Sequence, residues 1–373
     1  MADGSPTAAE VAAEGGGSDH WLRKAGLLLQ RALFVGAFGL VVGGLASLAA
    51  TGFVWCVEQL NDHLWISSRS RMMAGDWQWL PVLTIAVPAA GGLLVGLIKR
   101  LLVPGGRAHG PPDVIETAQT GDGRVRLRDG APGALAGIVS IGSGASVGQY
   151  GPLVHLGATI GSLLGRYTPY PRGKVGTIGI GCGVASAIST AFNAPIAGML
   201  FAHEVILRHY SLRAFAPITV ASTIGFVLAN FVFEQRPLFR IEGAPRVLPI
   251  EFSGFIVIGL LGAAVAIVFM RSIEGASWLA ARSRLPVPVR PAAGGALMGV
   301  LALWTPEVMG LAAETLRFAM IPDAFTATEL GVLVVAKIVA TAVCLGFGFV
   351  GGSFSPALVI GGLFGALMGQ AAV

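Results

Sequence analysis

Long stretches of the chain contain no Asp, Glu, Lys or Arg, and short charged segments separate them. These uncharged stretches cover residues 32–57, 77–98, 130–165, 175–203, 214–233, 252–270, 291–306 and 338–373. Because about 20 apolar residues in a helix span the hydrocarbon core of a bilayer, most stretches can form a transmembrane helix. The pattern predicts an all-α, polytopic membrane protein.

Two of the stretches, 130–165 and 338–373, are too long for a single span and are interrupted by glycine and proline. We expect each to form a broken helix whose two parts meet inside the membrane. Irregular backbone at that depth is tolerated only where it is buried in protein or lines a polar cavity. The two breaks are therefore the first candidates for a functional site.

The two long stretches share a pattern of glycine and proline at a spacing of 204 residues. The matching pairs are Gly142 and Gly346, Gly144 and Gly348, Gly148 and Gly352, Pro152 and Pro356, Gly157 and Gly361, Gly161 and Gly365, and Gly165 and Gly369. Each pattern predicts a break at Gly-x-x-x-Pro and a new helix with proline in its first turn. Duplicated broken helices are typical of transporters with inverted-topology repeats. The repeats would cover about residues 30–235 and 249–373.

The predicted breaks suit an anion. A helix N-terminus has unpaired backbone N–H groups and about half a positive charge. Two such ends, Tyr150-Gly151 and Phe354-Ser355, would meet at the middle of the membrane, and the segment 108–112 offers a third N-terminus. The alternative is that the glycines only permit close helix packing. We favour packing for Gly157, Gly161 and Gly165, and the anion site for the breaks.

Composition supports a membrane protein and excludes other classes. Hydrophobic residues make up 54% of the chain and charged residues 12%, against about 25% charged residues in ordinary soluble domains. The net charge of +5 is spread along the chain and does not suggest nucleic-acid binding. The 3 cysteines lie in apolar runs and suggest neither disulfides nor a metal site. No cofactor is expected.

No enzyme motif stands in a suitable context. The segment Gly144-Ala145-Ser146-Val147-Gly148 matches the nucleophile elbow of hydrolases, but that motif needs a strand, a turn and a helix, with Asp and His partners. We expect no enzymatic activity.

Basic residues precede the first predicted span and end the second, which predicts a cytoplasmic N-terminus. Residues 1–20 carry no Lys or Arg, so they do not form a signal peptide, and we expect a flexible tail.

The sequence resembles the CLC family of chloride channels and transporters from about residue 30 to the end. Gly148-Gln149-Tyr150-Gly151-Pro152 is similar to its Gly-Lys/Arg-Glu-Gly-Pro motif, and Gly352-Ser353-Phe354-Ser355-Pro356 to its Gly-x-Phe-x-Pro motif. The segment 191–198 (AFNAPIAG) resembles the family segment between these motifs, and 108–113 lies where the family has Gly-Ser-Gly-Ile-Pro-Glu. The resemblance implies a homodimer in the plasma or bacterial inner membrane, with one anion pathway in each subunit.

The resemblance also implies the pore residues, which are His109, Gly110, Gln149, Tyr150, Gly151, Ser353, Phe354 and Ser355. Two of the family's acidic positions differ in this chain. Its gating glutamate is replaced by Tyr150, whose phenol stays neutral at pH 7. Its proton-loading glutamate is replaced by Val205, which follows Glu204. We therefore predict a passive anion channel, with chloride as the expected ion.

Several alternatives remain open. His109 replaces a pore serine of the family and could retain the anion, or it could be bonded into the cytoplasmic connection. His109, His155 or His203 could instead relay protons in an antiporter. The second repeat is incomplete by the symmetry of the first, which suggests a fragment of a longer chain or a shortened member, conceivably a membrane scaffold that transports nothing. The sequence does not identify the preferred anion.

Four polar residues outside the motifs have structural interpretations. We expect His155 to make a structural hydrogen bond, His203 to lie at the membrane interface, Glu204 to make an internal hydrogen bond or ion pair, and Lys337 to extend its side chain from a helix end toward water.

Overall fold

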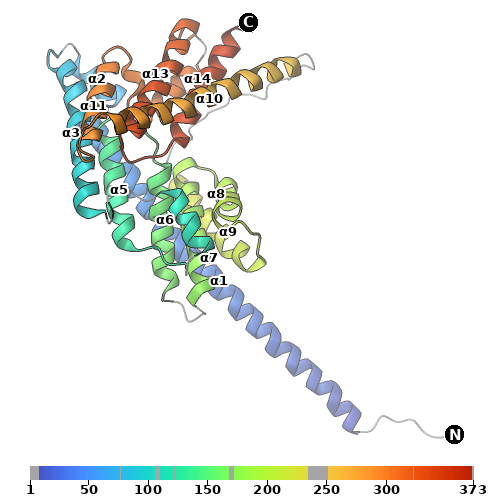
Figure 1. The fold of residues 1–373 in the computed structure, drawn as a ribbon. Helices are drawn as coiled ribbons and strands as arrows, with labels where there is room; N and C mark the ends of the chain where they lie inside the picture. The colour runs from blue at the N-terminus through green and yellow to red at the C-terminus, as the bar shows by residue number, and fades with distance from the viewer. Residues whose placement is uncertain are drawn as a thin grey trace.

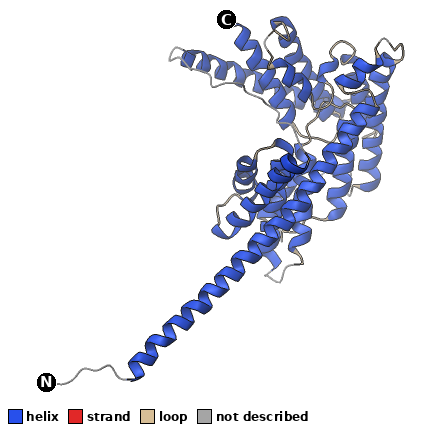
Figure 2. Cartoon of the chain, turned by 180° about the vertical axis from the view of Figure 1, so that it is seen from behind, coloured by secondary structure: helices blue, strands red, loops and turns tan. Residues whose placement is uncertain are grey.

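The computed structural model describes residues 8–75, 77–103, 105, 110–120, 123–167, 172–233, 251–321 and 323–371. All regular elements in these residues are helices (Figure 2), as the sequence predicts. They are α1 (Ala8–His63), α2 (Ser68–Ala74), α3 (Leu80–Leu102), α4 (Pro111–Gln119), α5 (Leu127–Gly142), α6 (Tyr150–Gly165), α7 (Arg172–Phe192), α8 (Pro195–Phe201), α9 (Leu212–Val227), α10 (Glu251–Arg282), α11 (Arg290–Leu301), α12 (Ala313–Ala319), α13 (Ala327–Gly346) and α14 (Phe354–Ala371), with the π-helices η2 (Ala202–Leu207) and η3 (Leu228–Val232) and the 3₁₀ helix η4 (Pro306–Val308).

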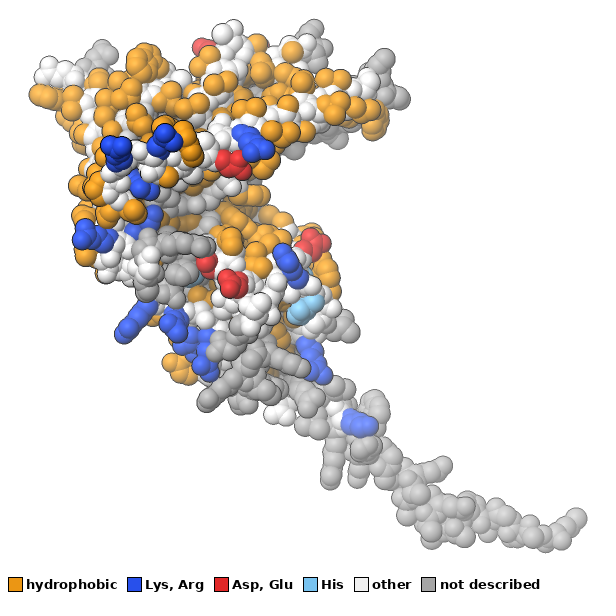
Figure 3. All heavy atoms as spheres, viewed as in Figure 1, with side chains coloured by type: hydrophobic (Ala, Val, Ile, Leu, Met, Phe, Trp, Pro, Cys, Tyr) orange, Lys and Arg blue, Asp and Glu red, His pale blue; other side chains and the backbone are white. Residues whose placement is uncertain are grey.

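Six helical segments among the described residues are long and apolar enough to cross a membrane. They are Leu33–His63, Leu80–Leu102, Arg213–Val232, Phe252–Arg282, Ala327–Gly346 and Phe354–Ala371. Hydrophobic side chains cover much of the surface around α10 in Figure 3, as expected for contact with lipid. This arrangement confirms a multi-pass membrane protein.

Helix α1 extends well away from the other helices toward the N-terminus (Figure 1). It begins at Ala8, inside the segment 1–20 for which we predicted a flexible tail. This segment is rich in alanine and glutamate, which favour helix formation. Residues 1–7 lie outside the described part of the chain.

Both long uncharged stretches are broken at the predicted places. The first separates into α5 and α6, and the second into α13 and α14. In each broken helix, the first part is followed by a turn at a glycine with positive φ. These glycines are Gly144 (φ 92°) and Gly348 (φ 98°), and glycine adopts this conformation without steric cost. The stretch 175–203 is also interrupted, at Asn193, between α7 and α8.

The two broken helices are joined by reciprocal hydrogen bonds. The Val350 N–H donates to Ser140 Oγ (3.0 Å), and the Ser146 N–H donates to Cys344 Sγ (3.3 Å). Ser140 and Cys344 occupy equivalent positions in the repeat, as do Ser146 and Val350, because both pairs have the spacing of 204. Each repeat therefore supplies the acceptor for a backbone donor of the other.

The pair α3 and α11 shows the same reciprocity at a spacing of 203. A Cβ added to Gly92 would lie 2.2 Å from the Pro291 carbonyl oxygen, and one added to Gly295 would lie 2.1 Å from that of Pro88. The two helices can pack this closely only because both positions are glycine. Our sequence comparison missed this part of the repeat, because its spacing differs by one residue.

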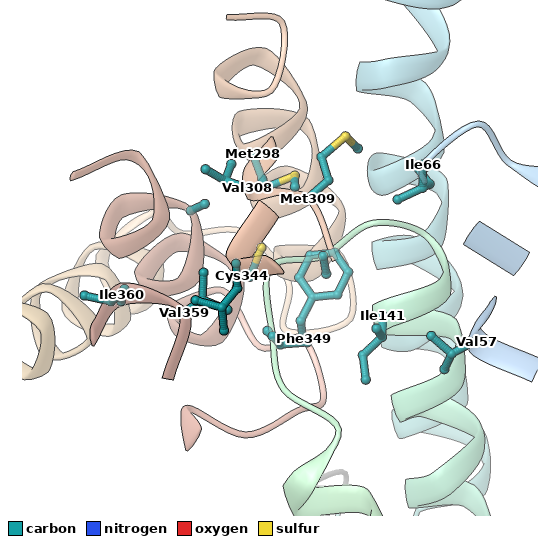
Figure 4. Packing of buried hydrophobic residues seen from close by; sticks show 14 of the residues in the cluster. Val57, Ile66, Ile141, Met298, Val308, Met309, Cys344, Phe349, Val359 and Ile360 are labelled. Atoms are coloured by element: carbon teal, nitrogen blue, oxygen red, sulfur yellow. The ribbon is translucent and has the colours of Figure 1, made fainter. Parts of the chain in front are cut away.

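The largest hydrophobic core contains residues of both repeats and surrounds the breaks. In Figure 4 the ring of Phe349 lies between Cys344 and Val359 on one side and Ile141 of α5 on the other. The two repeats thus share a core, which fixes the position of one break relative to the other.

The helices after the breaks differ in their surroundings. In the first repeat, α6 packs on α7 through Gly157 against Gly183 and Gly161 against Gly179. This confirms the packing interpretation for Gly157 and Gly161, and that for Gly165 stays a prediction. In the second repeat, a Cβ added to Gly361 or Gly365 would meet no atom of the described chain within 4 Å.

Candidate anion site

The N-termini of α6 and α14 meet where the two repeats cross. Gly148 and Gly352 form an antiparallel bridge, in which each N–H donates to the other residue's carbonyl oxygen at 2.7 Å. The rings of Tyr150 and Phe354, the first residues of the two helices, have centroids 5.3 Å apart. Both predicted helix ends therefore lie at one place, where Tyr150 is half-buried and Phe354 is exposed.

These two helix ends carry backbone N–H groups that have no partner within their own helix. The first N–H groups that donate a helical bond are those of Leu153, to the Gln149 carbonyl oxygen, and Ala357, to the Ser353 carbonyl oxygen. The preceding N–H groups have no hydrogen bond within the described residues; they belong to Gln149, Tyr150, Gly151, Ser353, Phe354 and Ser355. Unpaired N–H groups at two helix N-termini form a site for an anion without a cationic side chain.

The third predicted N-terminus, that of α4, is different. Its first two residues, Pro111 and Pro112, have no N–H. The Gly110 N–H donates to Asp113 Oδ2 (2.7 Å), and the Asp113 N–H donates to the Gly110 carbonyl (3.1 Å). The start of α4 thus keeps its donors for its own cap, and Gly110 offers none to an anion. His109 lies outside the described residues.

Aromatic side chains line the inner side of the site. Besides its contact with Phe354, the Tyr150 ring packs edge-on against Phe201 of α8 (centroids 5.5 Å apart). Phe354 in turn packs edge-on against Phe192, the last residue of α7 (5.3 Å). We call Tyr150, Phe192, Phe201 and Phe354 the aromatic layer. No charged side chain takes part in it.

A cavity of about 460 Å³ lies beside the meeting point of the two helix ends. It is lined by Thr51, Val54, Trp55, Val57, Glu58, Asn61, Gln149, Ala191, Phe192, Asn193, Phe233, Leu311, Ala313, Leu316, Arg317, Ser355, Leu358 and Val359. The cavity lies toward the C-terminal end of α1 and connects the surface with Gln149 and Ser355. We call it the vestibule.

The sequence analysis missed the contribution of α1 to the vestibule. Thr51, Glu58 and Asn61 come from this helix and belong to no motif of the breaks. Only their spacing along one helix could have indicated a common polar face. Asn193 was part of a quoted motif but had no assigned role; it has φ 55° and accepts a hydrogen bond from the Asn230 side chain.

A second polar cluster surrounds η2. Glu204 accepts a hydrogen bond from the Tyr210 hydroxyl (2.7 Å), which confirms the predicted internal hydrogen bond. This bond raises the pKa of the Tyr210 phenol, because it stabilises the protonated form. Val205 is half-buried beside it and places no ionisable group there.

That His203 lies at the membrane interface stays a prediction. Its side chain is fully buried, and the ring lies between Tyr210 and Phe215, with centroids 5.3 Å and 5.7 Å away. Nδ1 contacts the His209 carbonyl oxygen (3.2 Å), and Nε2 has no partner within the described residues. The sequence did not show this burial because it depends on the fold of the segment after η2.

The expectation that the Lys337 side chain extends toward water is wrong. The side chain is fully buried and does not reach water. Its Nζ donates to the carbonyl oxygens of Val308 (2.9 Å) and Gly310 (3.0 Å) in the segment between α11 and α12. These carbonyls replace water as acceptors, so Lys337 connects α13 to that segment. His155 is buried in α6.

A family model for the voltage-gated chloride channel matches residues 90–373. The chain belongs to this family, the CLC family. A relative from Ralstonia nicotianae, described as a putative chloride channel protein ClcB-like, is 30% identical over 88% of this chain and 77% of its own length. A voltage-gated ClC-type chloride channel ClcB from Escherichia coli (strain HS) is 27% identical over 88% of this chain and 79% of its own length.

Solved CLC structures have the same fold. A slow cyanobacterial Cl⁻/H⁺ antiporter superimposes with a TM-score of 0.79 at 22% identity, over 92% of this chain and 80% of that one. A CLC-type fluoride/proton antiporter gives a TM-score of 0.72 at 21% identity, over 88% and 79%. As a CLC protein, the chain is an anion-transporting membrane protein.

Proposed function

We propose that the protein is a passive anion channel, most simply for chloride. The observation that carries the proposal is Tyr150, which begins α6 and packs against Phe354 at the start of α14. A phenol with a reference pKa of about 10 stays neutral at pH 7, so it neither competes with the anion as a charge nor carries a proton. Val205 supplies no second proton acceptor on the other side of the aromatic layer.

The relatives support anion transport and differ in mechanism. The two similar sequences are described as chloride channels, whereas the two similar structures are antiporters. Coupled exchange of anions and protons needs a protonatable side chain that contacts the bound anion and also lies on the path of the proton. The residues at the helix ends of this chain include none, which favours the channel.

Three further features belong to this proposal. The protein would function as a homodimer in the bacterial inner membrane, with its N-terminus in the cytoplasm and one anion pathway in each subunit. His109 would retain the anion on the cytoplasmic side. Because a charged imidazole donates two hydrogen bonds and a neutral one donates a single bond, conductance would rise as His109 becomes protonated.

One observation favours a second candidate, an antiporter with a histidine relay. His203 is buried in a π-helix, a form of helix often found at functional sites, and its Nε2 has no partner within the described residues. A buried imidazole could accept a proton from the cytoplasmic side. His109 and His155 would be the other members of such a relay.

Chloride efflux from proteoliposomes, with external pH recorded at the same time, tests the proposal. We expect efflux that collapses the chloride gradient without proton movement, and no proton pumping when chloride runs down its gradient. Stoichiometric proton movement would contradict the channel and support the histidine relay. Absence of efflux, with protein that is folded and reconstituted, would contradict transport and leave a scaffold role.

A further inference from the structure

Four exposed arginines gather at the two ends of the first broken helix. Arg124, Arg126 and Arg128 stand just before or within the first turn of α5, and Arg166 follows the last residue of α6. The uncharged stretch 130–165 separates the first three from the fourth in the sequence. Arginine therefore marks both the place where this stretch begins and the place where it ends. We call these four residues the arginine patch.

Hydrogen bonds bring the two ends together on the surface of the molecule. Ser162 Oγ, near the end of α6, accepts a bond from the Val125 N–H (2.9 Å) and donates one to the Gly123 carbonyl oxygen (2.8 Å). Arg166 Nη2 donates to the Val125 carbonyl oxygen (3.1 Å). A Cβ added to Gly123 would lie 2.9 Å from the backbone nitrogen of Thr177 in α7. The segment before α5 is thus fixed against α6 and α7, which gives the patch a defined place.

The backbone of this segment directs its arginines outward. Val125 is buried, and alternate residues of an extended chain point to opposite sides, so Arg124 and Arg126 are exposed. Arg126 makes no capping hydrogen bond, and neither it nor Arg128 forms a salt bridge within the described residues. Both stand at the positive end of the α5 dipole, where a positive charge does not stabilise a helix. Their charges are therefore available to a partner outside the chain.

The local charge and two exposed apolar side chains indicate the kind of partner. Between residues 120 and 175 the sequence has six basic residues and two acidic ones, Asp122 and Asp129, which gives a net charge of +4. Leu127 is 56% exposed and Tyr167 is 81% exposed, and each is adjacent to an arginine of the patch. Tyrosine is enriched at the level of the lipid headgroups. A soluble anion would use only the charges, whereas a phospholipid uses the charges and the apolar side chains.

We propose that the arginine patch binds the headgroup phosphate of an anionic phospholipid. The planar guanidinium of arginine donates two parallel hydrogen bonds to phosphate oxygens. Leu127 and Tyr167 contact the apolar part of the same lipid. The predicted orientation places the patch on the cytoplasmic side, where anionic lipids attract basic residues close to the membrane. The bound lipid bridges the start of α5 and the end of α6, whether transport is passive or coupled to protons.

The double variant Arg126→Gln/Arg128→Gln tests the patch. Phosphatidylglycerol and phosphatidylcholine are titrated separately into the purified protein in detergent, and native mass spectrometry measures the bound lipid. We expect the parent to bind phosphatidylglycerol more tightly than phosphatidylcholine, and the double variant to bind phosphatidylglycerol roughly tenfold more weakly than the parent. Arg208→Gln/Arg213→Gln is the matched control, because it removes two exposed arginines elsewhere on the chain and should bind like the parent.

Three results would overturn the proposal. The first is equal binding of the two lipids by the parent, or equal binding of phosphatidylglycerol by the parent and Arg126→Gln/Arg128→Gln. The second is an equal loss in both double variants, which would reflect net charge and not this patch. The third is displacement of the lipid by millimolar inorganic phosphate, which would indicate a site for free phosphate. None of these measurements depends on anion flux, so they stand apart from the test of the channel.

Discussion

At the scale of single residues, the proposed channel function rests on the side chain that begins α6. Tyr150 occupies the position at which two helix N-termini meet, and its ring packs with Phe354 and Phe201. A carboxylate here would bring a negative charge to the unpaired N–H groups and compete with an anion. The neutral phenol leaves these donors to the anion and keeps the aromatic layer packed.

Replacing Tyr150 with glutamate should therefore create an acid-activated gate. A glutamate has a reference pKa of about 4.3. Flux should be high at low pH, where the side chain is neutral, and should fall as pH rises and the carboxylate forms. Proteoliposome efflux measured between about pH 4 and pH 8 gives the profile.

Tyr150→Gln is the matched control, because it has the size of glutamate and does not titrate. We expect a pH profile like that of the parent. If Tyr150→Glu also keeps the parent profile, Tyr150 is not at the gate.

At the scale of elements, the sequence predicts features that the backbone itself requires. The turn after α5 needs positive φ and the start of α6 tolerates proline, so glycine and proline recur at the spacing of 204. Side-chain roles are harder to predict. Ser140 and Cys344 are equivalent acceptors that differ in residue type. The burial of His203 depends on how the segment after η2 folds back, and that of Lys337 on a segment that precedes its helix.

The glycines of α6 and α14 provide a test of helix packing. In Gly161→Ala the new Cβ would lie 1.8 Å from the Gly179 carbonyl oxygen. Separation of α6 from α7 should destabilise the protein by about 1–3 kcal/mol. The equivalent change, Gly365→Ala, meets no described atom within 4 Å, so it should be neutral or stabilise by up to about 1 kcal/mol. Thermal unfolding in detergent measures both. If Gly161→Ala and Gly365→Ala destabilise the protein equally, α14 is packed against another helix as α6 is, and the prediction is wrong.

The reciprocal hydrogen bonds between the breaks provide a second test. Ser140→Ala removes the acceptor of the buried Val350 N–H, and we expect a loss of about 1–3 kcal/mol in stability. Cys344→Ser keeps an acceptor for the Ser146 N–H and should cost less. The same unfolding assay compares them. If Ser140→Ala is as stable as the parent, this bond does not hold the repeats together.

At the scale of the whole molecule, the vestibule exists only where distant parts of the chain converge. The vestibule takes residues from α1, α12 and α14, and from the breaks, and no one of these segments forms a binding site by itself. The sequence could locate the breaks from glycine and proline. It could not locate the α1 contribution, because Thr51 and Glu58 become vestibule residues only when α1 packs beside the crossing.

The two charged residues of the vestibule should control how anions enter it. Arg317 attracts an anion and Glu58 repels it, and both line the cavity. Arg317→Gln should raise the half-saturating chloride concentration roughly threefold at low ionic strength, and Glu58→Gln should lower it. Both effects should shrink near 1 M salt, where the screening length is about 3 Å. Efflux measured over a range of chloride concentrations, at several fixed ionic strengths set with gluconate, gives this dependence. A shift that stays constant with ionic strength would mean that the substitutions act by altering the shape of the vestibule, and that its charges do not steer the anion.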